Sequence, residues 1–186
     1  MPEEKYRQDA KMDRLSLLYS KTQLAGRVDQ LADMINRDYQ GKELVVVGIL
    51  KGTFVFLADL VRCLKLPIIV DFVGTSSYGL GSQPSHQITL TKDIQVSVQG
   101  KHVLIVEDIL DTGLTANFVL NLLKQREPAS LRLCALIDKK ERRIVPVTAD
   151  YVGFELEEGF VVGYGIDYAE RYRHLPNVYR LRLSTD

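Results

Sequence analysis

The stretch VLIVEDILDTGLTA, residues 103–116, decides the fold class of this 186-residue chain. Its first four residues are apolar, as expected of a buried strand, and the apolar residues of 117–123 have helical spacing. Open α/β sheets present ligand-binding groups where a strand ends in a short turn that leads into a helix. The stretch therefore predicts an α/β fold with a ligand site at this turn.

The turn combines two opposite chemistries. Glu107, Asp108 and Asp111 offer hard oxygen ligands suited to hydrated Mg²⁺ or to the hydroxyls of a sugar. Residues 112–115 offer backbone N–H groups and hydroxyls at a helix start, where a phosphate can bind. Carboxylates repel a phosphate unless the ligand carries a metal or a hydroxyl-rich sugar, so the turn predicts a sugar phosphate with Mg²⁺. A helix cap at Asp111 or Thr112 is the simpler alternative, but capping requires only one such side chain.

Strands and helices are expected to alternate through most of the chain. Buried strands are predicted at 44–50, 68–73, 103–106 and 131–137, with a weaker strand signal at 88–98. Helices are predicted after Ser20, which begins a capping box with Gln23, and over 54–64. This alternation indicates a parallel sheet with helices on both faces.

The pattern changes after residue 144. Short strands are predicted at 151–154, 160–164 and 179–183, separated by glycine and acidic turns, and no long helix lies among them. We interpret these strands, together with a short strand at 15–19, as a small cap over the carboxyl edge of the sheet.

Composition narrows the possible partners and compartment. The 24 basic and 24 acidic side chains cancel, so net charge gives no argument for a nucleic-acid or membrane partner. No apolar segment reaches the ~20 residues that span a bilayer. Cys63 and Cys134 lie in apolar runs and indicate no disulfide framework, which favours a reducing compartment. Because the N-terminus is polar and unlike a signal peptide, we expect a cytoplasmic protein.

Residues 103–116 resemble the phosphoribosyl-pyrophosphate-binding signature of the type I phosphoribosyltransferases, and 106–113 are most similar to the hypoxanthine-guanine branch. Segments 49–52, 77–78, 136–139, 152–154 and 160–168 match that family in the same order. The resemblance implies one domain over 1–186, a type I phosphoribosyltransferase-like fold with a twisted, mainly parallel sheet. Its core is expected at about 20–145 and a small hood at 1–19 and 146–186.

The resemblance also implies a reaction. Family members transfer ribose-5-phosphate from phosphoribosyl pyrophosphate to a purine ring nitrogen and release pyrophosphate, with Mg²⁺ as cofactor. Asp111 matches the carboxylate that accepts a proton from the base; related adenine enzymes usually have Ala there, and pyrimidine-operon regulators usually have Tyr. An Asp favours a 6-oxopurine substrate, hypoxanthine and guanine. Glu107 and Asp108 match residues that hold the ribose hydroxyls, directly or through Mg²⁺.

Further roles follow from the same resemblance. Thr112, Gly113, Leu114 and Thr115 match the family residues that form the 5′-phosphate cradle, and Leu114 lies where some relatives carry Lys. Lys51, Gly52 and Arg173 match the family residues that bind pyrophosphate. A cis peptide often precedes this lysine in the family, and the nearby Arg171 is the alternative candidate for the arginine.

The remaining matches concern the base and the closing loop. Lys139 matches a donor to the 6-oxo group, Phe160 a ring that stacks on the base, and Val161 a backbone that binds its pyrimidine edge. Asp167 matches a residue that orders Mg²⁺ waters. Ser77 and Tyr78 begin a loop that closes over the ligands in the family.

Each of these residues has a structural alternative. Lys51 could be a solvated turn residue, Phe160 a core strand residue, and 138–143 a solvated charge run. We interpret Lys140, Arg142 and Arg143 as surface charge.

The functional alternatives are a transferase that prefers xanthine and a non-catalytic RNA-binding regulator on the same fold. A receiver-like signalling domain explains the acidic turn but not Lys51–Gly52 or Phe160. Family members are commonly dimers or tetramers, so a homo-oligomer is expected.

Overall fold

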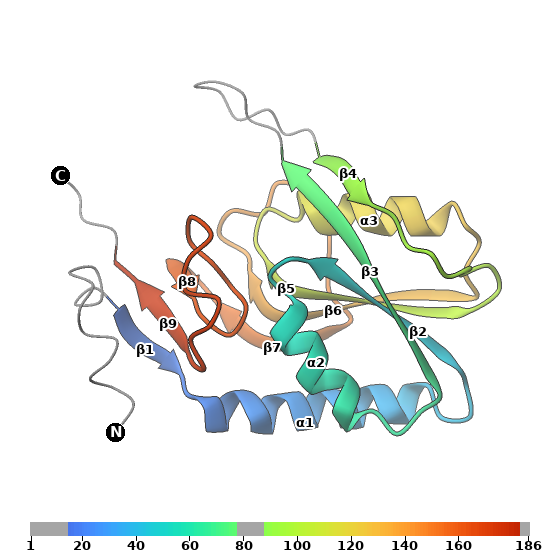
Figure 1. The fold of residues 1–186 in the computed structure, drawn as a ribbon, viewed down its shortest axis with the longest axis horizontal. Coiled ribbons are helices and arrows are strands. Elements are labelled where there is room, and N and C mark those ends of the chain that lie inside the picture. Colours follow the sequence, from blue (N-terminus) through green and yellow to red (C-terminus); the bar gives the residue numbers. More distant parts are fainter. Residues whose placement is uncertain (1–14, 78–87, 183–186) are drawn as a thin grey trace.

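The computed structural model describes residues 15–77 and 88–182, which form a large and a small sheet (Figure 1). The large sheet has the strand order β4-β3-β2-β5-β6-β7. All its strand pairs are parallel except β3–β4, which is antiparallel. The strands are β2 (Leu44–Leu50), β3 (Ile68–Ser77), β4 (Ile88–Lys92), β5 (His102–Leu110), β6 (Ser130–Lys139) and β7 (Tyr151–Leu156).

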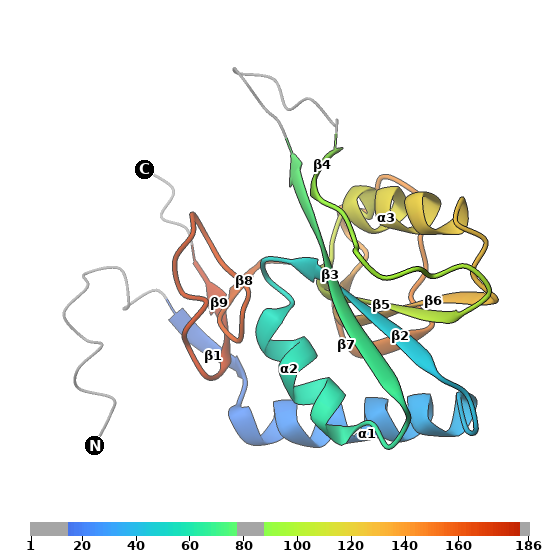
Figure 2. The same ribbon diagram turned by 45° about the vertical axis from the view of Figure 1, so that its right-hand side comes forward.

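Helices cover both faces of this sheet, which confirms the predicted α/β class. The helices α1 (Lys21–Asp38) and α2 (Phe54–Cys63) lie on one face and α3 (Leu114–Lys124) on the other (Figure 2). The predicted capping box starts α1: the Ser20 hydroxyl accepts from the Gln23 backbone N–H, and the Gln23 side chain accepts from the Ser20 backbone N–H. In the described part of the chain, no helix is long and apolar enough to cross a membrane.

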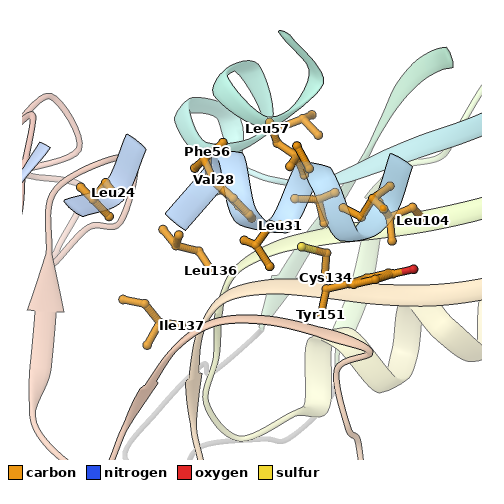
Figure 3. Packing of buried hydrophobic residues seen from close by; sticks show 14 of the residues in the cluster. Leu24, Val28, Leu31, Phe56, Leu57, Leu104, Cys134, Leu136, Ile137 and Tyr151 are labelled. Atoms are coloured by element: carbon orange, nitrogen blue, oxygen red, sulfur yellow. The ribbon is translucent and has the colours of Figure 1, made fainter. Parts of the chain in front are cut away.

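The core forms because buried strands present alternate residues to the two faces. Leu104 and Val106 of β5 pack in the cluster beneath α1 and α2, whereas Val103 and Ile105 pack in the cluster beneath α3. Figure 3 shows that the apolar side of α1 faces the strands; this side includes Leu24, Val28 and Leu31.

The small sheet has the order β1-β9-β8 and is antiparallel. Its strands are β1 (Leu15–Tyr19), β8 (Phe160–Val162) and β9 (Val178–Leu181). Strand β1 therefore joins the chain's carboxyl-terminal strands as expected, and this sheet lies to one side of the large one (Figure 1).

Two predicted elements away from residues 103–116 differ from the structure. Residues 151–154, which we interpreted as a strand of the cap, instead belong to β7 (Tyr151–Leu156), which extends the large sheet beside β6. Gly153 allows this pairing, because a Cβ there would lie 2.3 Å from the Leu136 carbonyl oxygen. The strand expected over 88–98 ends at Lys92, after which the chain turns and Asp71 accepts from the backbone N–H groups of Gln95 and Val96.

Candidate active site

The large sheet opens between its two central strands at their carboxyl ends. Strands β2 and β5 pair from Leu44–His102 to Gly48–Val106 and no further. Beyond that point β2 continues beside β3 and β5 continues beside β6. Because β3 lies on one side of β2 and the strands from β5 onward lie on the other, this is the switch point at which α/β sheets bind ligands.

Glu107 and Asp108 lie inside β5 at this opening, not in a turn after a strand ending at 106 as predicted. Burial raises the pKa of the Glu107 carboxyl well above its usual range, with a further contribution from Asp108. Burial likewise raises the pKa of Asp108 to about 6, although backbone N–H groups and the Arg173 cation oppose the shift. Both carboxylates are therefore costly to keep charged without a ligand or cation beside them.

Asp111 follows β5, beside the end of β6, and does not cap the helix that follows. The N-cap of α3 is Gly113, which makes no side-chain cap bond. The Asp111 Oδ1 atom is buried and accepts no hydrogen bond from any described residue. Lys139 Nζ lies 3.8 Å from Oδ1 and an Arg142 guanidinium nitrogen lies 3.6 Å from Oδ2. The Oδ1 atom is therefore left as an available hydrogen-bond acceptor, with a lysine and an arginine close by.

The segment 112–115 forms the turn into α3. Gly113 has φ +82°, a left-handed conformation that favours glycine, and the Leu114 N–H points back to the Thr112 hydroxyl at 3.4 Å. The first N–H groups of α3 are thus presented where the strand ends, as the predicted phosphate cradle requires.

Lys139 and Phe160 come together from different sheets. The Lys139 side chain is only 4% exposed and its Nζ lies 5.8 Å from the centre of the Phe160 ring. Phe160 is 44% exposed, which excludes the alternative that it is an ordinary core residue. Val161 is buried on β8, which lies at one edge of the small sheet and pairs with β9 alone within it. An exposed ring, a buried cation and a strand edge that no other described strand pairs with can together contact a flat polar base.

Lys51 and Gly52 follow β2 on the other side of the opening, and the Leu50–Lys51 peptide is cis. A Cβ on Gly52 would lie 1.8 Å from Asp108 Oδ2, so the glycine brings this backbone against β5. Gly165, with φ +98°, also lies close to this backbone: a Cβ there would lie 2.2 Å from the Gly52 carbonyl oxygen.

The segment that follows Gly165 supplies a cluster of charges. Arg173 lies 2.8 Å from Asp167 and 3.3 Å from Glu170, and it donates to the Gly165 carbonyl at 2.9 Å. Glu170 also lies 3.1 Å from Lys51 Nζ. Of the two arginines, Arg173 is the one that these contacts join to the cluster, whereas Arg171 is exposed.

The residues predicted to hold a metal are Glu107, Asp108 and Asp167. Within residues 15–77 and 88–182, no three His, Cys, Asp or Glu side chains form a ready cation cage. The Glu107 Oε2 atom is nevertheless buried without a hydrogen-bond partner, and Asp167 raises the pKa of Asp108. This arrangement fits Mg²⁺, which usually binds through one or two carboxylates and the substrate's own oxygens.

Two functional candidates were missed from the sequence. Glu170 gave no motif signal, because its partner Lys51 is 119 residues away. Arg143 was interpreted as surface charge, but it is largely buried and bonds to the turn that carries Asp111. Ser77 ends β3, and the loop predicted from Tyr78 onward lies outside the described residues.

Comparison with known proteins agrees with this geometry. The sequence profile of the phosphoribosyl transferase domain family matches residues 16–169. A hypoxanthine phosphoribosyltransferase from Haemophilus influenzae is 49% identical over 89% of this chain and 94% of its own length.

Solved structures give the same result. A hypoxanthine phosphoribosyltransferase from Staphylococcus aureus has a TM-score of 0.88 and 38% identity, covering 95% of this chain and 96% of that one. A hypoxanthine-guanine phosphoribosyltransferase from Bacillus anthracis has a TM-score of 0.83 and 44% identity, covering 90% of this chain and 97% of that one.

Proposed function

The chain belongs to the phosphoribosyltransferase family, and we propose that it transfers ribose-5-phosphate from phosphoribosyl pyrophosphate to hypoxanthine and guanine, in purine salvage. The observation that carries the choice of substrate is the meeting of Asp111, Lys139 and the exposed Phe160 ring at the end of β5 and β6. These residues offer a proton acceptor, a hydrogen-bond donor and a stacking surface, which are the groups that a 6-oxopurine needs.

The proposed chemistry has one proton transfer and one displacement. As a purine ring nitrogen bonds to the anomeric carbon of the ribose, the bond from that carbon to pyrophosphate breaks and pyrophosphate leaves with the electron pair. Asp111 accepts the proton from the other imidazole nitrogen of the base. The ribose hydroxyls lie against Glu107 and Asp108, and the 5′-phosphate binds to residues 112–115.

Other residues position the two ligands. Lys139 donates to the 6-oxo group, Phe160 stacks on the base, and the free edge of Val161 binds its pyrimidine side. The backbone of Lys51–Gly52 and the guanidinium of Arg173 bind pyrophosphate. Glu107, Asp108 and Asp167 are the proposed contacts of Mg²⁺, which when bound neutralises the phosphate oxygens and the charge that develops as pyrophosphate leaves.

A spectrophotometric assay tests this function. Purified protein, phosphoribosyl pyrophosphate and Mg²⁺ are combined with hypoxanthine, guanine, xanthine or adenine in turn, with and without a chelator. We expect Mg²⁺-dependent turnover of hypoxanthine and guanine and little of adenine. Preference for xanthine would select the alternative transferase, and no turnover of any 6-oxopurine would refute the proposal.

Lys139→Gln is expected to lower kcat/KM for hypoxanthine by roughly 10–100-fold, because a buried charged donor is lost. Adenine has an amino group in place of the 6-oxo group, so the ratio of hypoxanthine to adenine turnover should fall. Lys140→Gln is the matched control, since the neighbouring Lys140 is exposed and pairs with Glu155 at 3.1 Å. An unchanged ratio in Lys139→Gln would remove Lys139 from base selection.

Glu170→Gln is expected to tighten pyrophosphate binding by less than about tenfold, the scale of exposed ion pairs. The Glu170 carboxylate pairs with the Arg173 guanidinium proposed for pyrophosphate and with the ammonium of Lys51, whose backbone is proposed for the same ligand. The hydrogen bonds from these two cations, Lys51 first, lower the pKa of Glu170. The inhibition constant of pyrophosphate measures the effect, with Glu158→Gln at an exposed position as control. Weaker inhibition of the Glu170→Gln variant by pyrophosphate would instead mean that Glu170 helps to bind this ligand.

Two further statements belong to the proposal. The cysteines Cys63 and Cys134 are free, which fits a cytoplasmic location. A homo-oligomer, dimer or tetramer, is proposed from the family relationship, and light scattering in solution would measure its size.

A further inference from the structure

Arg143 lies in the loop after β6, and its side chain is only 16% exposed. Its guanidinium donates to the carbonyl oxygens of Leu110 at 3.0 Å and Asp111 at 2.9 Å. It makes further hydrogen bonds to the Val147 carbonyl and to the Asp138 carboxylate, and a longer one of 3.4 Å to the Lys139 carbonyl. One side chain thus contacts the ends of both β5 and β6.

The charge of this buried guanidinium is balanced by Asp138, whose side chain is 4% exposed. The other four acceptors are backbone carbonyl oxygens. Only the planar guanidinium fork offers enough donors in fixed directions to reach so many acceptors at once, and the ammonium of a lysine does not.

The surrounding loop follows the same turn closely. The Ile144 N–H donates to the Thr112 carbonyl at 2.9 Å. Gly113 makes room for Arg143, since a Cβ there would lie 3.0 Å from the Arg143 Cδ atom. Hydrogen bonds from the segment that contains Arg143 therefore fix the turn from Leu110 to Gly113.

We propose that Arg143 is a positioning residue for catalysis: it fixes the Asp111 carboxylate and the Lys139 ammonium relative to each other on the two strand ends. The separation that it maintains is the 3.8 Å between Lys139 Nζ and Asp111 Oδ1. This inference rests on the proposed function, in which these two groups contact neighbouring atoms on one edge of the same base, the 6-oxo group and the adjacent imidazole nitrogen. It assigns no contact between Arg143 and the substrate.

The test compares Arg143→Ala and Arg143→Lys with the wild-type enzyme in steady-state assays. A displacement on the order of 1 Å can cost about 100-fold in rate, so we expect kcat of both variants to fall by about that factor while KM for phosphoribosyl pyrophosphate changes much less. Guanidinium ion, added far below unfolding concentrations, should restore part of the kcat of Arg143→Ala only. Arg126→Ala, which removes a partly exposed arginine paired with Asp93 at 2.7 Å, is the control and should retain wild-type kcat without rescue.

A purely structural role gives a different outcome. In that case the melting temperature falls, the folded fraction retains wild-type kcat, and guanidinium restores no kcat; this result would overturn the inference. A crystal structure of Arg143→Ala supplies a readout that needs no turnover, because an unchanged Lys139–Asp111 separation would also overturn it. Absence of turnover in the wild-type enzyme, in contrast, would refute the proposed function itself.

Discussion

Asp111→Asn is expected to lower kcat by roughly 10²–10⁴-fold, the usual contribution of a positioned proton acceptor. The amide has nearly the shape of the carboxylate, but it does not accept the proton that the base must lose. The groups proposed to bind the ribose and the 5′-phosphate are untouched, because they belong to Glu107, Asp108 and residues 112–115. Binding of phosphoribosyl pyrophosphate should therefore remain close to that of the wild-type enzyme.

Single-turnover kinetics and a titration with phosphoribosyl pyrophosphate measure the two effects separately. Asp33→Asn, an exposed position on α1, makes the same chemical change away from the site and serves as control. Near-wild-type turnover of Asp111→Asn would remove Asp111 from the role of base. A loss of phosphoribosyl pyrophosphate binding equal to the loss of kcat would place Asp111 in the phosphate cradle instead.

Gly52→Ala is expected to lower kcat/KM by at least about 100-fold, because one methyl group forces apart the two sides of the opening. The new Cβ would lie 1.8 Å from Asp108 Oδ2 and 2.5 Å from its Cγ atom. Either the buried Asp108 carboxylate rotates off its backbone N–H partners, or the Lys51–Gly52 backbone moves away from β5. Each response displaces a group proposed to bind phosphoribosyl pyrophosphate.

The measurement is KM for phosphoribosyl pyrophosphate together with the inhibition constant of pyrophosphate, and both should rise. Gly26→Ala is the matched control, since no described atom beyond its own stretch of helix lies within 4 Å of the added Cβ, and alanine favours a helix. Unchanged constants in a folded Gly52→Ala protein would show that the close approach to Asp108 has no part in ligand binding.

The sequence predicted the parallel core well, because buried parallel strands appear as nearly continuous apolar runs. The predicted strand ended too early, at residue 106, because the apolar run that predicts a buried strand stops at the charged Glu107 and Asp108. The structure keeps both residues in the strand because β6 continues to pair with β5 as far as Leu110–Asp138. The prediction also assigned β7 to the wrong sheet, because the residue pattern within a short strand does not encode which strand it pairs with.

The candidate site was predicted mainly where the family resemblance supplied matching motifs. The structure brings Asp111 and Lys139 together because β5 and β6 are parallel neighbours. Arg143 could not be predicted, because a run of charges is typical of a solvated loop and its acceptors are carbonyl oxygens fixed only by folding. Glu170 was also missed, because its ion pair with Lys51 joins distant parts of the chain that only folding brings together.

The most direct test of the account is a crystal structure of the protein with phosphoribosyl pyrophosphate, Mg²⁺ and a 9-deaza-6-oxopurine, whose ring carbon replaces the attacking nitrogen. We predict the 5′-phosphate on the N–H groups of residues 112–115, the base stacked on Phe160, and an Asp111 carboxylate oxygen within hydrogen-bond distance of the imidazole nitrogen. A base bound with Asp111 out of reach of its imidazole edge would contradict the account.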